Sequence, residues 1–127
     1  MESDKVTPGG ESHQKSLNPH TNSVCHCEHL KLKEPLQIGE VRELLKQVRA
    51  SVPGLIEIHL GENMNICAGK PDATGGSTHA LFSRHRNAHY LKIYYTHPAR
   101  VNLMNKLMSK AERPAAVVDF VNIVSKL

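Results

Sequence analysis

The sequence contains no tryptophan, and aromatic residues make up only 4% of its 127 residues. It also lacks a basic cluster, because the lysines and arginines behind the net charge of +4 are spread along the chain. A nucleic-acid-binding protein usually combines a basic face with stacking aromatic residues or a recognisable motif. We therefore expect no nucleic-acid partner, and we attribute the mild basicity to solubility.

Long hydrophobic runs are missing as well. The sequence has no stretch of 18 apolar residues that could span a membrane, and no apolar signal-peptide segment follows Met1. The three cysteines, Cys25, Cys27 and Cys67, are odd in number. Without an export signal they indicate reduced thiols in an intracellular protein, for which we expect no membrane partner.

Apolar residues are also scarce at the start of the chain. The first 22 residues bury too little apolar surface to offset the entropy lost on ordering. We expect residues 1–22 to form a disordered tail, residues 23–123 to form one domain, and residues 124–127 to form a C-terminal tail. A domain of this length is close to the commonest size, and the chain is too short for two independent cores.

The last three residues, Ser125-Lys126-Leu127, match the tripeptide that a peroxisomal import receptor reads at a carboxyl terminus. Three ordinary residues could end a chain in this way, but the match lies at the one position where the signal works, which favours a targeting signal. Provided that Leu127 is the native terminus, we expect a peroxisomal location and the import receptor as a partner. The tripeptide carries no information about chemistry.

Local patterns predict seven elements. Alternating or continuous apolar residues predict four strands, over residues 23–33, 55–60, 78–85 and 115–123. Helical spacing predicts an amphipathic helix over residues 38–52, which a Pro-Gly pair ends. Asn87 can cap a second helix, Pro98 interrupts it and begins a third, and Arg113-Pro114 ends the third. The order β-α-β-β-α-α-β predicts a ferredoxin-like α+β sandwich with its second helix broken in two.

Helices can cover only one face of a four-stranded antiparallel sheet. We expect the other face to carry the apolar side chains of Leu55, Ala80, Phe82, Val118 and Phe120. An apolar sheet face left in water favours aggregation, so a second sheet should cover it. The sequence therefore predicts a homodimer that forms a dimeric α+β barrel through twofold symmetry.

Several segments resemble a known family, the stress-responsive dimeric α/β-barrel domain. They are HCEHLKLK (26–33), SVPGLIEIHLGEN (51–63), STHALF (77–82) and YYTHPARVNLMNKL (94–107), followed by VVDF (117–120). The Tyr-x-x-His-Pro-Ala signature joined to a terminal VVDF strand is the most specific part. The resemblance covers nearly the whole predicted domain and implies the same dimeric fold.

The family includes heat-stable plant proteins without clear chemistry and olivetolic acid cyclase, a polyketide cyclase. The resemblance places His26 and His79 at the strand histidines of the cyclase, Tyr94 at its tyrosine, and His97 at the histidine of the His-Pro-Ala element. The position of the general base is occupied by Arg100 here. An arginine stays protonated and cannot abstract a proton, although it could bind a carboxylate or stabilise an oxyanion.

Two interpretations of these residues remain open. His26 or His79 could act as general base with Tyr94 as oxyanion donor, if the three converge in one pocket. Alternatively, both histidines are hydrogen-bonded sheet residues and Tyr94 belongs to the core. We expect His97 to bond a free carbonyl group at the helix break. Glu28 takes an apolar position of the family on the pocket side of its strand, so its carboxylate needs a partner.

A metal site is not expected. The run Cys25-His26-Cys27-Glu28-His29 has suitable ligands, but alternation along a strand sends the two cysteines and His29 to one face and the other two residues to the opposite face. A fourth ligand is not evident. The sequence therefore predicts no metal and no other cofactor.

Two functions of different classes follow. The first is a peroxisomal, stress-responsive homodimer with a protective or small-ligand-binding role. We favour it because Arg100 stands at the position of the general base and cannot accept a proton. The second is a polyketide cyclase-like or related enzyme that acts on a small carbonyl or acyl substrate by histidine general-base chemistry. A monooxygenase on the same dimeric fold is a third option, supported by fold analogy alone.

Overall fold

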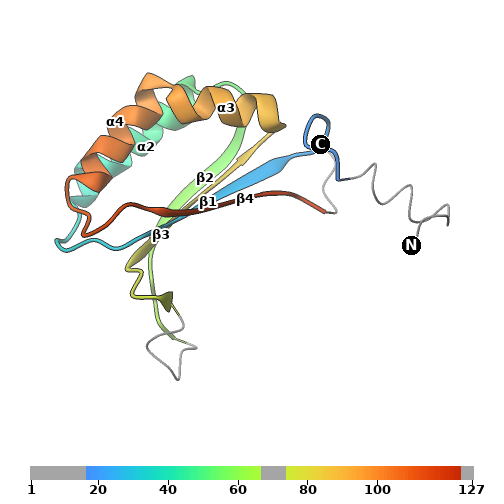
Figure 1. Ribbon diagram of the computed structural model, residues 1–127. Helices are drawn as coiled ribbons and strands as arrows, with labels where there is room; N and C mark the ends of the chain where they lie inside the picture. Colours follow the sequence, from blue (N-terminus) through green and yellow to red (C-terminus); the bar gives the residue numbers. More distant parts are fainter. Residues whose placement is uncertain (1–16, 67–73, 124–127) are drawn as a thin grey trace, which may run out of the picture.

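The computed structural model describes residues 17–66 and 74–123 (Figure 1). Cys67, the tripeptide Ser125-Lys126-Leu127 and residues 1–16 of the expected tail lie outside the described residues. Within the described part, residues 17–22 form a turn. The amide of Asn22 donates to the carbonyl oxygen of Asn18, and the carbonyl oxygen of Pro19 accepts from the amide of Ala88. Hydrogen-bonded structure therefore begins before the expected domain boundary at Ser23.

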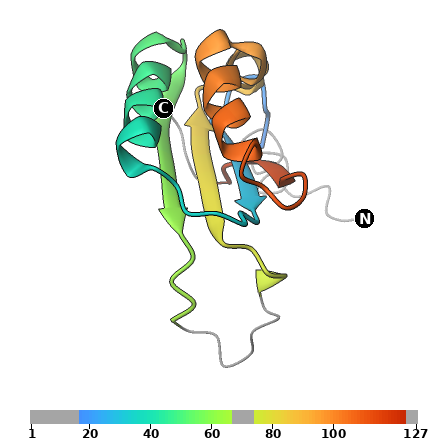
Figure 2. The same ribbon diagram turned by 90° about the vertical axis from the view of Figure 1, so that its left-hand side faces the viewer.

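The observed elements confirm the predicted order. They are β1 (Val24–Leu30), α2 (Ile38–Ser51), β2 (Leu55–Glu62), β3 (His79–His85), α3 (Ala88–Thr96), α4 (Pro98–Met108) and β4 (Ala116–Val121). The strands form one antiparallel sheet in the order β2-β3-β1-β4. The three helices lie together on one face of this sheet, as Figures 1 and 2 show. None of the described helices is long and apolar enough to cross a membrane.

The helices begin where the sequence predicts. The side chain of Asn87 accepts a hydrogen bond from the amide of Tyr90 and so caps α3. Pro98 occupies the first turn of α4, where its missing N–H is not needed. The predicted end of α4 at Arg113 is wrong, because the helix ends at Met108 and a turn follows.

The core lies between the helices and the sheet. On α2 the core residues are Val41, Leu45 and Val48, which recur at helical spacing and are all buried. Ile58 of β2 is also buried. Leu55 joins this core too, so the prediction that it faces the helix-free side is wrong. A register shift between Leu55 and Glu57 breaks the alternation of β2 and turns Leu55 towards the helices.

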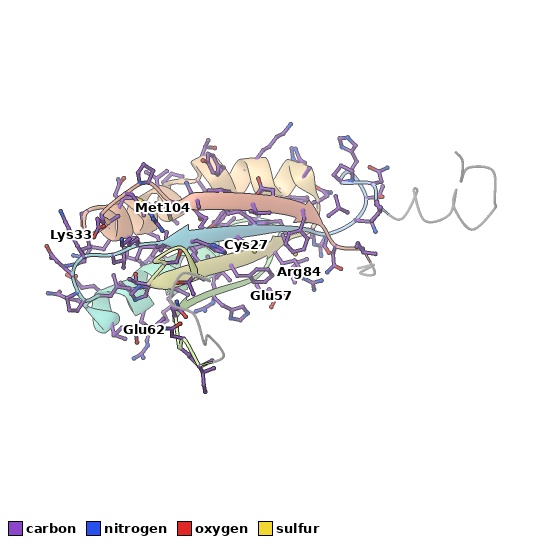
Figure 3. The ribbon with its side chains drawn as sticks, turned by 60° about the horizontal axis from the view of Figure 1, so that its bottom comes forward. Cys27, Lys33, Glu57, Glu62, Arg84 and Met104 are labelled. Carbon is purple, nitrogen blue, oxygen red and sulfur yellow. The ribbon has the colours of Figure 1, made fainter. Side chains whose placement is uncertain are left out.

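The opposite face of the sheet carries no helix. Val118 and Phe120 of β4 are 59% and 46% exposed on it, and the strand pairing puts them on the same side as Phe82. Figure 3 brings this face forward and shows Glu57 and Arg84 on it; their side chains form an ion pair of 3.1 Å. Large apolar side chains are therefore exposed beside polar ones on the helix-free face.

Candidate functional site

His26 lies in the middle of β1, between Ser83 of β3 and Asp119 of β4. Only 1% of its surface is exposed, and its ring packs edge-on against Tyr94 and Tyr95 of α3. Its Nδ1 atom is hydrogen-bonded to Oδ1 of Asp119, and its Nε2 atom lies 3.2 Å from Oε1 of Glu28. The second approach is within ion-pair distance but lacks the angles of a hydrogen bond. The imidazole is thus held between two carboxylates.

Glu28 has a second partner on the helical side. Its Oε2 atom accepts from Nη2 of Arg100 at 3.1 Å, and both side chains are buried. The guanidinium group lies 4.4 Å from the ring centre of Tyr95 and 5.5 Å from that of Tyr94. Such cation–π contacts add to the ion pair when water is excluded. Arg100 is therefore fixed by Glu28 and by two aromatic rings.

These contacts form a chain of alternating charge, which we call the charge chain: Asp119, His26, Glu28 and Arg100. Burial alone disfavours a charged His26, but its interactions with the carboxylates of Glu28 and Asp119 outweigh burial and raise the pKa of His26. With His26 protonated, two carboxylates face two cations and the chain is neutral. A buried ion pair is stable only when its charges are matched in this way.

Tyr94 stands beside the charge chain and is fully buried. Its ring lies 5.9 Å from the ring of His26 and 4.6 Å from that of His85. Its hydroxyl group has no hydrogen-bond partner among the described residues. Burial, followed by the charge of Glu28, raises the pKa of this hydroxyl, against the opposing effect of Arg100. A neutral phenol without a partner can donate to an oxygen atom of a ligand.

His85 is a buried member of the same cluster that the sequence did not single out. Its Nε2 atom is 2.9 Å from the hydroxyl oxygen of Ser83. Burial and the neighbouring charge of His26 lower the pKa of His85 to about 4, so the ring is neutral near pH 7. Alternation along β3 puts it on the same face as Ser83, but nothing in the sequence shows that this end of the strand meets Tyr94.

The predicted trio is only partly brought together. His26 and Tyr94 are in contact, whereas His79 pairs with Leu30, four residues further along β1. The Nδ1 atom of His79 is 2.8 Å from the hydroxyl oxygen of Thr78. His79 instead lines two depressions at the far end of the sheet, of about 510 and 520 Å³. It therefore lies apart from the charge chain.

His97 and Arg100 do not lie open to a ligand. The side chain of His97 accepts a hydrogen bond at Nδ1 from the amide of Ala99, at 3.1 Å, and so caps the start of α4. The expectation that it would bond a carbonyl group is wrong: the ring satisfies a free amide of the next helix, not a carbonyl of the previous one. Arg100 is 8% exposed and already has a carboxylate partner in Glu28.

A groove between α3 and β4 leads to the charge chain; we call it the α3–β4 groove. It has a volume of about 480 Å³, within the usual range of ligand sites. Its lining is mostly apolar and includes Leu91, Tyr95 and Val117, and its polar part consists of His26, Lys92, Thr96 and Asp119. Asp119 is 53% exposed and uses Oδ1 for His26, so its carboxylate also faces the groove. His26 therefore borders this groove.

The cysteine-rich segment does not gather ligands. Across the described ranges, 17–66 and 74–123, no group of three or more His, Cys, Asp or Glu side chains is placed to hold a metal ion. Cys25 is buried and Cys27 is half-buried, and both are free thiols. Burial raises the pKa of each thiol, which lowers its reactivity.

A titration of the histidine rings by NMR tests the charge chain. His26 should keep its proton above pH 6.5, and His85 should stay neutral until about pH 4. The linkage signs are opposite. The contribution of His26 to stability is complete below pH 6.5 and is lost as the pH rises through its raised pKa. The contribution of His85 is complete above pH 6.5 and is lost as the pH falls towards 4.

A matched pair of variants sharpens the titration. Asp119→Asn should lower the pKa of His26 because it removes one of the two carboxylates, whereas Glu43→Gln on the exposed side of α2 should leave that pKa unchanged. If His26 and His85 both titrated near pH 6.5 in the unmodified protein, the result would contradict the charge chain.

Solved structures of other proteins have a similar fold. In solved structures the fold is similar to a dimeric ferredoxin-like protein of unknown function from Jannaschia (TM-score 0.65, 18% identity, 79% of this chain and 99% of that chain). It is also similar to the hydroxynitrile lyase of Passiflora edulis (TM-score 0.63, 18% identity, 80% and 94%). A protein of Arabidopsis thaliana is similar as well (TM-score 0.61, 19% identity, 82% and 99%).

No curated protein sequence matches the chain. The sequence profile of the stress-responsive A/B barrel domain matches residues 24–122, which include all four strands and all three helices. The predicted fold class and the resemblance noted from the sequence are both confirmed. The chain belongs to the stress-responsive A/B barrel domain family.

Proposed function

We propose that this chain is a homodimeric A/B barrel protein that binds a small, largely apolar molecule in the α3–β4 groove. The observation that carries the proposal is the apolar groove of about 480 Å³ with His26 and Asp119 among its lining residues. A few polar groups in an apolar depression are the usual composition of a small-molecule site. The role would be protective or one of ligand binding, without proton transfer by a histidine.

The helix-free face supports the dimer. Val118 and Phe120 are exposed there, on the sheet face that also carries Phe82. Exposed apolar patches on a sheet are commonly covered by a partner, and a second copy is the simplest one. Similar folds from Jannaschia and Thermobifida fusca are described as dimeric ferredoxin-like proteins.

The charge chain argues against general-base catalysis. His26 faces a carboxylate at each ring nitrogen, and its raised pKa favours the protonated form of the ring. Arg100, in the position of the family base, is permanently protonated and paired with Glu28. Neither group has a free basic nitrogen to accept a proton. Binding of a molecule with a hydrogen-bond donor, such as a hydroxyl group facing Asp119, fits these groups better.

The alternative is an enzyme that acts on a small carbonyl or acyl compound. It draws support from the buried hydroxyl of Tyr94, which has no partner among the described residues, and from the likeness to a hydroxynitrile lyase. In this alternative His26 would act as base and Tyr94 would donate to the oxyanion. His79, at the far end of the sheet, and Arg100, paired with Glu28, are not placed to take part. Turnover of a small carbonyl compound that disappears in Tyr94→Phe and in the matching histidine variant would select this alternative.

Binding in the groove is tested with 4-ethylphenol as a probe, followed by NMR shift changes of the backbone amides. We expect shifts at Leu91, Tyr95 and Val117, since these side chains line the groove. Val117→Ser should weaken binding roughly fivefold because about 1 kcal/mol of apolar contact is lost. Val101→Ser, on an exposed part of α4 outside the groove, is the control. Shifts confined to other surfaces would refute the proposed site.

The dimer is tested by sedimentation or light scattering. Val118→Glu should raise the dimer Kd more than about 100-fold, because an unpaired charge buried at an interface costs several kcal/mol. Val118 is 59% exposed in the single chain, so the fold should tolerate the change. Val101→Glu on α4 serves as the matched control and should leave the dimer intact. An unmodified protein that stays monomeric at high concentration would contradict the proposal.

Where Leu127 is the carboxyl-terminal residue of the protein, we propose that Ser125-Lys126-Leu127 directs import into peroxisomes through the receptor for this tripeptide. A fluorescent protein fused to the N-terminus should then reach peroxisomes, and the same protein fused after Leu127 should not. Microscopy of the two fusions decides the point: equal import of both would exclude the tripeptide as the address.

A further inference from the structure

A second groove lies at the other edge of the sheet, between α2 and β2; we call it the α2–β2 groove. Figure 2 shows α2 beside β2, and the strand order puts β2 at the opposite edge of the sheet from β4. Its volume is about 520 Å³. The apolar part of its lining comes from Leu36, Ile38, Val41, Leu45 and Leu60. Ile38 is 58% exposed, so an apolar surface is open to solvent at this groove.

Two arginines of α2 line the same groove. Arg49 donates from Nη2 to the carbonyl oxygen of Ile58 at 3.0 Å, which fixes its guanidinium group against β2. Arg42 has no hydrogen bond, ion pair or ring contact with any described residue, although it lies beside the apolar side chains. A guanidinium group next to an apolar surface can bind a carboxylate through two parallel hydrogen bonds.

The other charges near α2 do not neutralise Arg42. Glu40 forms an ion pair with Lys106 at 2.7 Å, and Glu43 lies 3.4 Å from the side-chain nitrogen of Gln47. Glu62, labelled in Figure 3, is the acidic residue that lines the groove. It is the last residue of β2, where the strand pairing puts it opposite His79. Two arginines against one glutamate leave the groove with a positive balance. The charge therefore favours an anionic ligand.

We propose that the α2–β2 groove binds a monocarboxylate with an unbranched apolar chain. The carboxylate pairs with Arg42, and the chain covers Ile38 and runs along Leu45 towards Leu60 and His79. Arg49 adds positive charge and holds the wall of the groove. The glycine at position 61 leaves room at the far end, since a side-chain carbon there would meet no atom within 4 Å. This second site is independent of the α3–β4 groove.

The test compares octanoate with octan-1-ol, which has the same chain length but no charge, by NMR titration of the full chain. We expect octanoate to shift the amide resonances of Val41 and Leu60 and to bind about tenfold more tightly than the alcohol, because a charge-assisted pair is added. Arg42→Gln should bring octanoate to the affinity of the alcohol. Arg86→Gln, an exposed arginine before α3, is the matched control and should change nothing.

A second variant tests the position of the chain. Ile38→Ser should weaken both probes by a similar factor, and its exposed position allows the fold to persist. Equal affinity of octanoate and octan-1-ol, unchanged binding of octanoate by Arg42→Gln, or shifts confined to the α3–β4 groove would each overturn the proposal. Shifts confined to that groove would leave the proposed function intact, so the two results are distinguishable.

Discussion

The carboxylate of Glu28 lies in the middle of the sheet with only 2% of its surface exposed, and Arg100 is the counter-charge that makes this possible. Leaving such a buried carboxylate without its partner costs about 3–5 kcal/mol, a large part of the stability of a small domain. The pair therefore fixes α4 to β1. Glu28 also contacts His26, and His26 contacts Asp119 of the edge strand β4. The buried charge of Glu28 is therefore linked to β4 as well as to α4. The chemistry available to the site follows from this arrangement.

The elements were predictable because each depends on local rules. Asn87 caps α3 and Pro98 begins α4, as their side-chain chemistry requires. The turn of Leu55 into the core was not predictable, since a strand bulge adds one residue without a sequence signal strong enough to place it. The end of α4 at Met108 was not predictable either: a turn replaces the last residues that were expected to be helical.

The candidate site was harder to predict because it depends on register between distant strands. Glu28 and Arg100 were each singled out, but their pairing joins residues 72 positions apart. Asp119 contacts His26 because the pairing of β1 with β4 puts the two residues opposite each other. His79 does not contact His26 because it pairs with Leu30, four residues further along β1. The alternation of side chains predicts which face of the sheet a residue lies on, but not which residue of the neighbouring strand lies opposite it. The side-chain pairs between strands could therefore be identified only from the structure.

The turn before β1 makes a backbone hydrogen bond to the first residue of α3. The family match begins at residue 24, but Ala88, the first residue of α3, donates its amide to Pro19, five residues earlier than that boundary. A protein trimmed to the family boundaries would lose this acceptor and leave a helix amide without its partner. The two tyrosines that contact Arg100 belong to this helix. The short segment ahead of the barrel is thus an anchor for the helix that carries the aromatic half of the site.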